Sequence, residues 1–404
     1  MPRMPVDTVG LLLTGGGARA AYQVGVLEAI ADLRLEARVG EPGSPFGVIT
    51  GTSAGAINAA ALATHADDFD HSVRRLVAVW KDFRPSQIYR TDVLWSIDVG
   101  GGHWRMPFGL KWLFNFWQHK QPRSMLDNTP LAELLEHMVP LHRLPGLMQA
   151  GCLRALAVSA SSYSTGENYI FYQSDALIEP WVRSRRMAIP GRITQAHLLA
   201  SAAIPFVFPT VGISMRGGHI EYFGDGSIRQ VAPLSPAIHL GAQRLLAIGA
   251  SRLHEPQDLP RPNTHTGYPT LAQVAGHAIS SIFLDALTVD VEYMQRINQT
   301  LALIPESERA GTTLRPIELL VISPSERIDV IAARHTRALP ELLRRMLGHL
   351  SSSGPPGNEA VKASALASYL LFDADFTREL MELGRADTLR QRDAVRAFFG
   401  WATQ

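Results

Sequence analysis

The sequence predicts an α/β fold in which a mainly parallel central sheet is sandwiched by helices, with a helical C-terminal extension. Two observations lead to this prediction. Short apolar runs typical of buried strands alternate with stretches that have helical spacing, which is the pattern of a parallel sheet between helical layers. Near the C-terminus, a break rich in Ser, Gly and Pro at residues 351–357 is followed by helix-like segments alone.

The expected strands are short, mostly aliphatic, and bounded by turn residues. They lie near residues 9–14, 46–50, 153–159, 168–172, 219–223, 244–249 and 317–322. Helices are expected at residues 22–33, 54–63, 130–138 and 271–303, and in the C-terminal extension near residues 365–371, 376–383 and 394–399. Asn128 or Thr129 is expected to cap the helix at residues 130–138.

One serine lies on an expected strand-to-helix turn, in the segment GTSAG at residues 51–55. Gly51 and Gly55 leave room for the sharp turn that this serine requires. The N-terminus of the following helix also carries a partial positive charge that can stabilise an alkoxide or an oxyanion. The pattern predicts that Ser53 is a nucleophile, and the alternative is a glycine-bearing turn that contains a serine by chance.

Three consecutive glycines, Gly15, Gly16 and Gly17, follow the first expected strand. Without side chains in the way, their N–H groups can hold an anionic oxygen. Gly15, Gly17 and Ala20 also match the dinucleotide fingerprint G-x-G-x-x-[GA]. That fingerprint requires an acidic residue at the end of the second strand, where this chain has Thr-Gly-Thr-Ser at residues 50–53. No Gly-Lys-Ser/Thr follows either, so a phosphate-binding P-loop is excluded.

A third motif, Gly-Asp-Gly-Ser at residues 224–227, ends the expected strand at residues 219–223. The Asp-Gly pair forms a tight turn that presents the carboxylate of Asp225. By itself, Asp-Gly is a common hairpin turn. Because it comes third, after the glycine loop and the Gly-x-Ser-x-Gly motif, we interpret Asp225 as a catalytic candidate.

The three motifs in this order resemble the patatin-like phospholipase family. The similarity extends over roughly the first 250 residues and includes the phrase ASAAIPFVFP at residues 200–209. The chain differs from the family's usual pattern at three positions. Thr14 precedes the glycines where the family has Asp, Ala20 stands where it usually has Gly, and Ser227 follows the Asp-Gly pair where it has Gly or Ala. These positions affect substrate placement more than hydrolysis itself.

The resemblance implies a role for each motif residue. It makes Ser53 the nucleophile and Asp225 its partner in a Ser-Asp dyad. It places an oxyanion hole on the amides of Gly16 and Gly17, and puts Arg19 at the basic position of the loop. The remaining motif residues support these groups: Gly15, Gly51, Gly55 and Gly226.

A Ser-Asp-His triad is the alternative to a dyad, because several histidines follow Asp225 in the chain: His239, His254, His265 and His277. In an α/β-hydrolase the serine elbow comes after several strands, whereas only two expected strands precede Ser53. None of these histidines lies in a motif that indicates a base. The dyad is therefore favoured.

Composition excludes several other classes of protein. A formal charge of +1 gives no bulk attraction for nucleic acid. Cys152 is the single cysteine, and the 14 histidines show no metal-ligand spacing, so we expect no disulfide, metal or other cofactor. Residues 1–7 have no signal-peptide core, and no apolar run approaches the length of a transmembrane helix. We expect a cytoplasmic protein that touches membranes only peripherally.

The segment at residues 93–117 has an unusual composition. It contains four of the seven tryptophans, several phenylalanines and several basic residues. We expect this insertion to cover the active site and to contact a lipid surface or an acyl chain. The alternative is a satellite core beneath a long loop.

We therefore expect a patatin-like α/β hydrolase domain at residues 1–325, with a motif-bearing core at 9–250 and the aromatic insertion at 93–120. Residues 326–404 are expected to form the helical extension, with a linker near 351–358. The expected function is a lipid acyl hydrolase of the phospholipase A, lysophospholipase or carboxylesterase type. Two alternatives stay open: a non-catalytic lipid- or partner-binding protein on the same fold, and an esterase for short soluble esters or polyesters.

Overall fold

A computed structural model of the protein describes these residues: 8–90, 124, 126–253, 286–309, 311–312, 314–341, 343–344 and 366–401. Several expectations lie outside the described residues. They concern the aromatic insertion at 93–120, the linker near 351–358, the first part of the long helix at 271–285, and three histidines: His254, His265 and His277.

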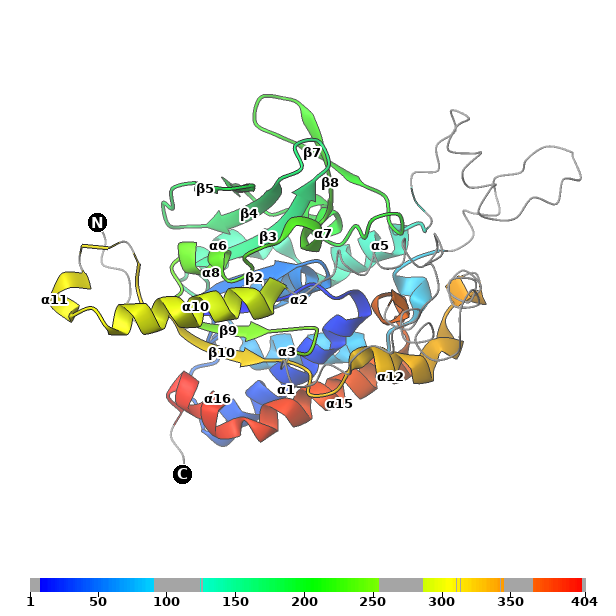
Figure 1. Ribbon diagram of the computed structural model, residues 1–404. Coiled ribbons are helices and arrows are strands. Elements are labelled where there is room, and N and C mark those ends of the chain that lie inside the picture. Colours follow the sequence, from blue (N-terminus) through cyan, green and yellow to red (C-terminus); the bar gives the residue numbers. More distant parts are fainter. Residues whose placement is uncertain are drawn as a thin grey trace, which may run out of the picture.

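A ten-stranded sheet runs through the centre of the described chain (Figure 1). The strand order is β10-β9-β1-β2-β3-β4-β6-β5, and β8 pairs with β3 and β7. The first five strands in that order are mutually parallel, and their bounds are β1 Val9–Leu13, β2 Val48–Thr52, β3 Ala155–Ser162, β9 Arg244–Ile248 and β10 Glu318–Ile322. Helices flank this mixed, mostly parallel sheet, which confirms the predicted fold class.

The other strands extend the sheet beyond β3. Their bounds are β4 Asn168–Ser174, β5 Val182–Arg183, β6 Arg186–Pro190, β7 Val211–Ser214 and β8 Ile220–Asp225. β4 and β8 are both antiparallel to β3. The strands β5, β6 and β7 were not expected from the sequence, because they are short and carry arginine, proline or glycine instead of an apolar run.

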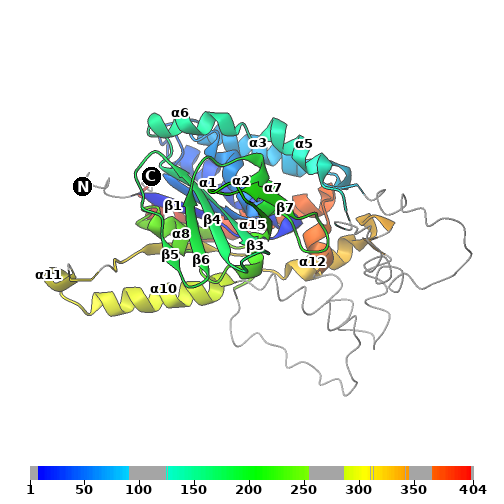
Figure 2. The same cartoon turned by 90° about the horizontal axis from the view of Figure 1, so that it is seen from above.

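Helices cover both faces of the sheet (Figure 2). One face carries α8 Ser235–His239 and α10 Ala286–Ala302. The other face carries most of the remaining helices: α1 Ala21–Glu36, α2 Ala54–Ala63, α3 Phe69–Lys81, α5 Thr129–Met138, α6 Leu144–Gln149, α7 Gln195–Ser201, α12 Ile328–His335, α15 Ala374–Arg390 and α16 Arg392–Phe399. Neighbouring residues of β1 alternate between the two cores, with Leu11 and Leu13 in one and Leu12 in the other.

Shorter helical elements complete the described chain. They are α11 Glu306–Arg309 and the 3-10 turns η1 Gly17–Ala20, η2 Pro85–Gln87, η4 Leu141–Arg143, η5 Gly226–Arg229 and η7 Thr336–Ala338. The cap of α5 differs from the expectation. Asn128 is the N-cap residue but its side chain makes no capping bond, and the Asp127 carboxylate accepts from the amide and the hydroxyl of Thr129 instead. An Asx turn one residue earlier therefore replaces the expected cap.

The C-terminal helix α15 packs directly on α1 (Figure 1). A Cβ on Gly25 would lie 1.9 Å from the carbonyl oxygen of Met381, and one on Gly384 would lie 2.2 Å from that of Tyr22. The Tyr22 hydroxyl donates to the Asp387 carboxylate at 2.9 Å. The helical C-terminal region thus shares the core that α1 forms with the sheet, while the proposed division at residue 325 stays a prediction.

Candidate active site

Ser53 lies on the sharp turn between β2 and α2. Its backbone has φ 55° and ψ −132°, a region that residues with a side chain rarely adopt. The flanking glycines are required by space. A Cβ on Gly51 would lie 2.5 Å from the carbonyl oxygen of Gly55, and one on Gly55 would lie 2.4 Å from those of Leu13 and Thr14. The structure therefore has the elbow geometry that the sequence predicts.

A hydrogen bond to a neighbouring helix fixes this strained turn. The Ser53 amide donates to the Ser201 hydroxyl at 2.8 Å, and that hydroxyl donates to the carbonyl of Ser159 in β3 at 2.6 Å. Ser201 lies at the end of α7 and is fully buried. The sequence analysis noted its segment but did not assign it a role.

The sheet register brings Ser53 and Asp225 together. One side of β3 is paired with β4, so β2 and β8 share the other side. β2 occupies that side as far as Ser159, and β8 occupies it from Ala160 onward in the opposite direction. The C-terminal ends of β2 and β8 therefore meet, and the Ser53 hydroxyl donates to Oδ2 of Asp225 at 2.6 Å.

Asp225 is fully buried, and its carboxylate accepts hydrogen bonds from Ser53 and Ser227. Besides the bond from Ser53, its Oδ1 accepts from the Ser227 amide at 2.8 Å. Burial raises the pKa of Asp225 from 3.8 to about 6, and the hydrogen bonds from Ser53 and Ser227 oppose this rise. A carboxylate with this pKa is a stronger base than an exposed aspartate and is still ionised at neutral pH.

The turn after Asp225 is held tightly against β3 and β4. The carbonyl of Gly226 accepts from the side-chain Nδ2 of Asn168 at 3.0 Å and from the Ser161 hydroxyl at 3.3 Å. A Cβ on Gly226 would lie 2.3 Å from the carbonyl oxygen of Ser159. Only glycine fits this position, so the Asp-Gly pair is required for the carboxylate to reach Ser53.

The glycine loop follows β1 and lies against Ser53. A Cβ on Gly15 would lie 2.4 Å from the Ser227 hydroxyl oxygen and 3.1 Å from the Ser53 Cβ. Gly17 has a φ of 54°, and a Cβ there would lie 2.2 Å from the carbonyl oxygen of Tyr369. Within the described chain, no hydrogen-bond acceptor is found for the amides of Gly15, Gly16 and Gly17. These N–H groups are available to an anionic ligand.

Arg19 connects the glycine loop to the C-terminal region. Its side chain is buried, and its Nε donates to the Ser368 hydroxyl at 2.7 Å. The guanidinium also lies 4.1 Å from the centre of the Tyr369 ring, a cation–π contact. The basic position of the motif therefore holds the segment that lies over the loop, a long-range contact that no local sequence pattern indicates.

A chain of buried polar side chains lies behind the glycine loop. Trp80 Nε1 donates to Asn58 Oδ1 at 3.0 Å, and Asn58 Nδ2 donates to Gln23 Oε1 at 3.1 Å. Gln23 Nε2 then donates to the carbonyl of Thr14 at 2.7 Å, at the start of the loop. None of these residues is predicted from the sequence as part of the site. The signal was present in Asn58, the one polar side chain in the otherwise apolar helix α2.

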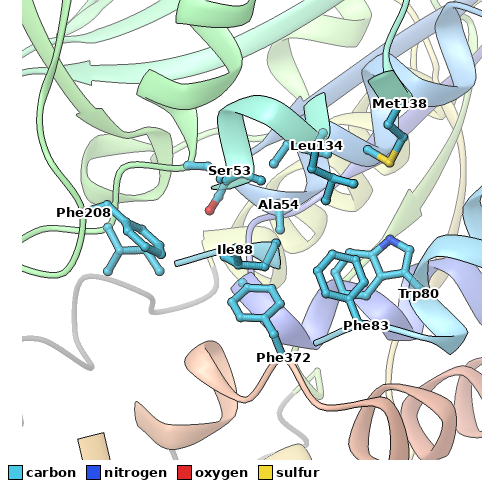
Figure 3. A pocket seen from close by; sticks show the side chains of 14 residues that line it. Ser53, Ala54, Trp80, Phe83, Ile88, Leu134, Met138, Phe208 and Phe372 are labelled. Carbon is cyan, nitrogen blue, oxygen red and sulfur yellow. The ribbon is translucent and has the colours of Figure 1, made fainter. Parts of the chain in front are cut away.

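An apolar pocket opens at Ser53 (Figure 3). Its walls come from α2, α3, α5, the segment around Phe208, and the C-terminal segment that contains Phe372. The labelled aromatic and aliphatic side chains surround the space in front of the Ser53 hydroxyl (Figure 3). The site thus combines one hydroxyl, one buried carboxylate and unbonded amides beside an apolar pocket.

No histidine is among the hydrogen-bond partners of Ser53 or Asp225 in the described chain. His239 stacks on Trp181 with ring centres 4.7 Å apart, and its Nδ1 lies 2.8 Å from the Ser235 carbonyl oxygen. It ends α8, which leads into the start of β9, whereas Ser53 follows the C-terminal end of β2. His239 is thus at the opposite end of the parallel strands.

No cluster of three or more potential metal ligands occurs in the described part of the chain. Among the same residues, no helix is both long and apolar enough to span a membrane.

Comparison with a family model agrees with the motifs. The model of the family described as patatin-like phospholipase matches residues 11–238, from β1 to α8, so the chain belongs to the patatin-like phospholipase family. At the family level it is a lipid acyl hydrolase. A solved structure of VipD from Legionella pneumophila matches 94% of this chain and 67% of VipD, with 12% identity and a TM-score of 0.32. A search among curated proteins gives no match.

Proposed function

We propose that the chain is a serine carboxylic-ester hydrolase that uses Ser53 and Asp225 as a catalytic dyad. The observation that carries the proposal is the 2.6 Å hydrogen bond from the Ser53 hydroxyl to a fully buried carboxylate. Nucleophile and base are in hydrogen-bond contact before any substrate binds, as the chemistry requires. A protein that only binds lipid would not need both groups.

In the proposed reaction, the Ser53 oxygen attacks the ester carbonyl carbon while its proton passes to Asp225. The carbonyl oxygen becomes an oxyanion, which the amides of Gly16 and Gly17 and the N-terminus of α2 stabilise. The tetrahedral intermediate expels the alcohol, which takes the proton from Asp225 and leaves the acyl group on Ser53. Water then attacks the acyl-enzyme, giving its proton to Asp225, and the fatty acid leaves as Ser53 recovers a proton.

The apolar pocket supports a lipid acyl group as the substrate's reacting part. Except for Ser53, every side chain that lines it is apolar or aromatic. An acyl chain in this pocket can place its carbonyl carbon beside Ser53, because Ser53 lines the pocket. Esters of short soluble acids would bury little surface here, so we propose lipid esters over soluble ones.

The test is a comparison of purified wild-type protein with Ser53→Ala and Asp225→Asn on phospholipids and p-nitrophenyl esters. Each substitution should lower kcat/KM by about a thousandfold or more, because nucleophile and base act as one unit. Asp290→Asn is the matched control. Asp290 is another aspartate whose pKa burial raises to about 6, but it lies on α10, which covers the other face of the sheet.

Full activity in Asp225→Asn would contradict the dyad and return attention to a histidine base. A wild-type protein that binds lipid but hydrolyses no ester would contradict the proposed function as a whole. The control variant Asp290→Asn should have the same turnover as wild type.

A further inference from the structure

A second groove adjoins the pocket at Ser53. Leu134 and Met138 of α5 line both spaces, so these two side chains form the wall between them. Met138 is buried and Leu134 is half-buried. The described residues that line both spaces are thus flexible aliphatic side chains, which can change rotamer without moving the backbone.

The two spaces are consecutive along the helices that form their floor. Ala54 and Ile57 of α2 line the pocket at Ser53, and Ala61, one turn further along α2, lines the second groove. On α3, Leu76 at the groove precedes Trp80 at the pocket. The two helices run in opposite directions, because Trp80 bonds to Asn58 and Ser72 bonds to the carbonyl of Ala61. On both helices, therefore, the groove lies beyond the pocket in the direction away from Ser53.

The second groove has a mostly apolar floor and a polar rim. Its buried lining includes Ala61 and Leu76 together with two polar residues, His65 and Ser72, whose side chains hydrogen-bond to the carbonyl of Ala61. Arg75 and His137 at the rim are exposed to solvent. Methylene groups can pack on such a floor while the charged ends of the rim residues stay in water. This chemistry suits the tail of an alkyl chain.

The helix geometry sets the chain length at which the groove is reached. Ala54 and Ala61 are seven residues apart on α2, which corresponds to about 10 Å along the helix axis. An extended alkyl chain advances about 1.3 Å per carbon, given a C–C bond of about 1.5 Å and a near-tetrahedral angle. A chain whose carbonyl carbon is at Ser53 therefore passes the shared wall after about eight carbons.

We propose that the distal carbons of a long acyl chain pass Leu134 and Met138 and lie in the α2–α3 groove, which makes the protein selective for long-chain over short-chain acyl esters. This inference rests on the proposed function, in which Ser53 carries the acyl group. It adds that Leu134, Met138 and the groove beyond them determine chain-length preference.

The experiment fills the groove without disturbing the core. Ala78 of α3 lines the groove and is exposed, so Ala78→Trp adds a bulky ring inside the groove and leaves the pocket at Ser53 intact. Arg74→Trp is the matched control, since Arg74 is exposed one turn earlier on α3 and lines neither space. The substrates are p-nitrophenyl butyrate, octanoate and palmitate.

Ala78→Trp should lower kcat/KM for palmitate by more than about tenfold, since each methylene left in water costs about fourfold. Butyrate and octanoate turnover should change by less than about twofold, because those chains end before the groove. Arg74→Trp should match wild type on all three esters. Equal losses on butyrate and palmitate, or no loss on palmitate, would overturn the inference while leaving the hydrolase proposal intact.

A second measurement does not depend on turnover. Calorimetric binding of palmitic and octanoic acids to Ser53→Ala should show palmitic acid weakened by Ala78→Trp and octanoic acid unchanged. If wild type hydrolyses no ester but this binding pattern holds, the proposed function fails and the groove assignment stands. If neither acid's binding responds to Ala78→Trp, the groove assignment fails.

Discussion

Replacing Asp225 with asparagine should inactivate the protein and stabilise it at the same time. Burial of the charged carboxylate raises its pKa from 3.8 to about 6, which means that the ionised form is destabilised in the folded state. Asparagine has nearly the same shape. Its oxygen can still accept from the Ser227 amide, and its NH₂ group can donate to the Ser53 oxygen, so a hydrogen bond to each of these neighbours can be kept.

The sign and size of this effect follow from proton linkage. Between pH 3.8 and about 6, folded wild-type protein keeps the Asp225 proton and the unfolded chain has lost it, so stability falls as pH rises through this window. The total loss is about 3 kcal/mol, and above pH 7 it is complete. Asp225→Asn does not titrate, so at pH 8 it should be more stable than wild type by up to that amount.

The assay is thermal unfolding by circular dichroism at pH 4, 6 and 8. With an unfolding entropy of about 2.1 cal/mol/K per residue over the whole chain, 3 kcal/mol corresponds to a Tm increase of about 3 °C at pH 8. The difference should shrink toward pH 4, where wild-type Asp225 is also neutral. A variant that is less stable than wild type at pH 8, or a difference that does not change with pH, would refute the reasoning.

Two further predictions concern the same site, and a third concerns the aromatic insertion. The kcat/KM of wild type should fall as pH decreases through about 6, because protonated Asp225 cannot accept the nucleophile's proton, and a pH–rate profile checks this. Ser201→Ala removes the acceptor for the buried amide at the elbow and should lower Tm and kcat, while Ser201→Thr should restore part of both. The composition of the aromatic insertion predicts that replacing Trp112, Phe116 and Trp117 with serine weakens vesicle binding, which a flotation assay would show. Turnover of a soluble ester should not change.

The order of the motifs and the local geometry at each one could be predicted from the sequence. The elbow at Ser53 depends on glycines two residues away on either side, and an apolar strand and a small-residue helix flank it directly. Glycine requirements and hydrophobic periodicity act over a few residues, so they can be read in order along the chain. The same holds for the glycine loop after β1 and for the Asp-Gly turn after β8.

Only the tertiary structure decided how these local pieces meet. Ser53 and Asp225 are 172 residues apart, and they touch because β2 and β8 end against each other along one side of β3. The pKa of Asp225 depends on its complete burial, which neighbours distant in sequence produce. Likewise, the contact of Arg19 with Ser368 spans 349 residues. Such pairings depend on sheet register and helix packing, which no residue pattern along the chain specifies on its own.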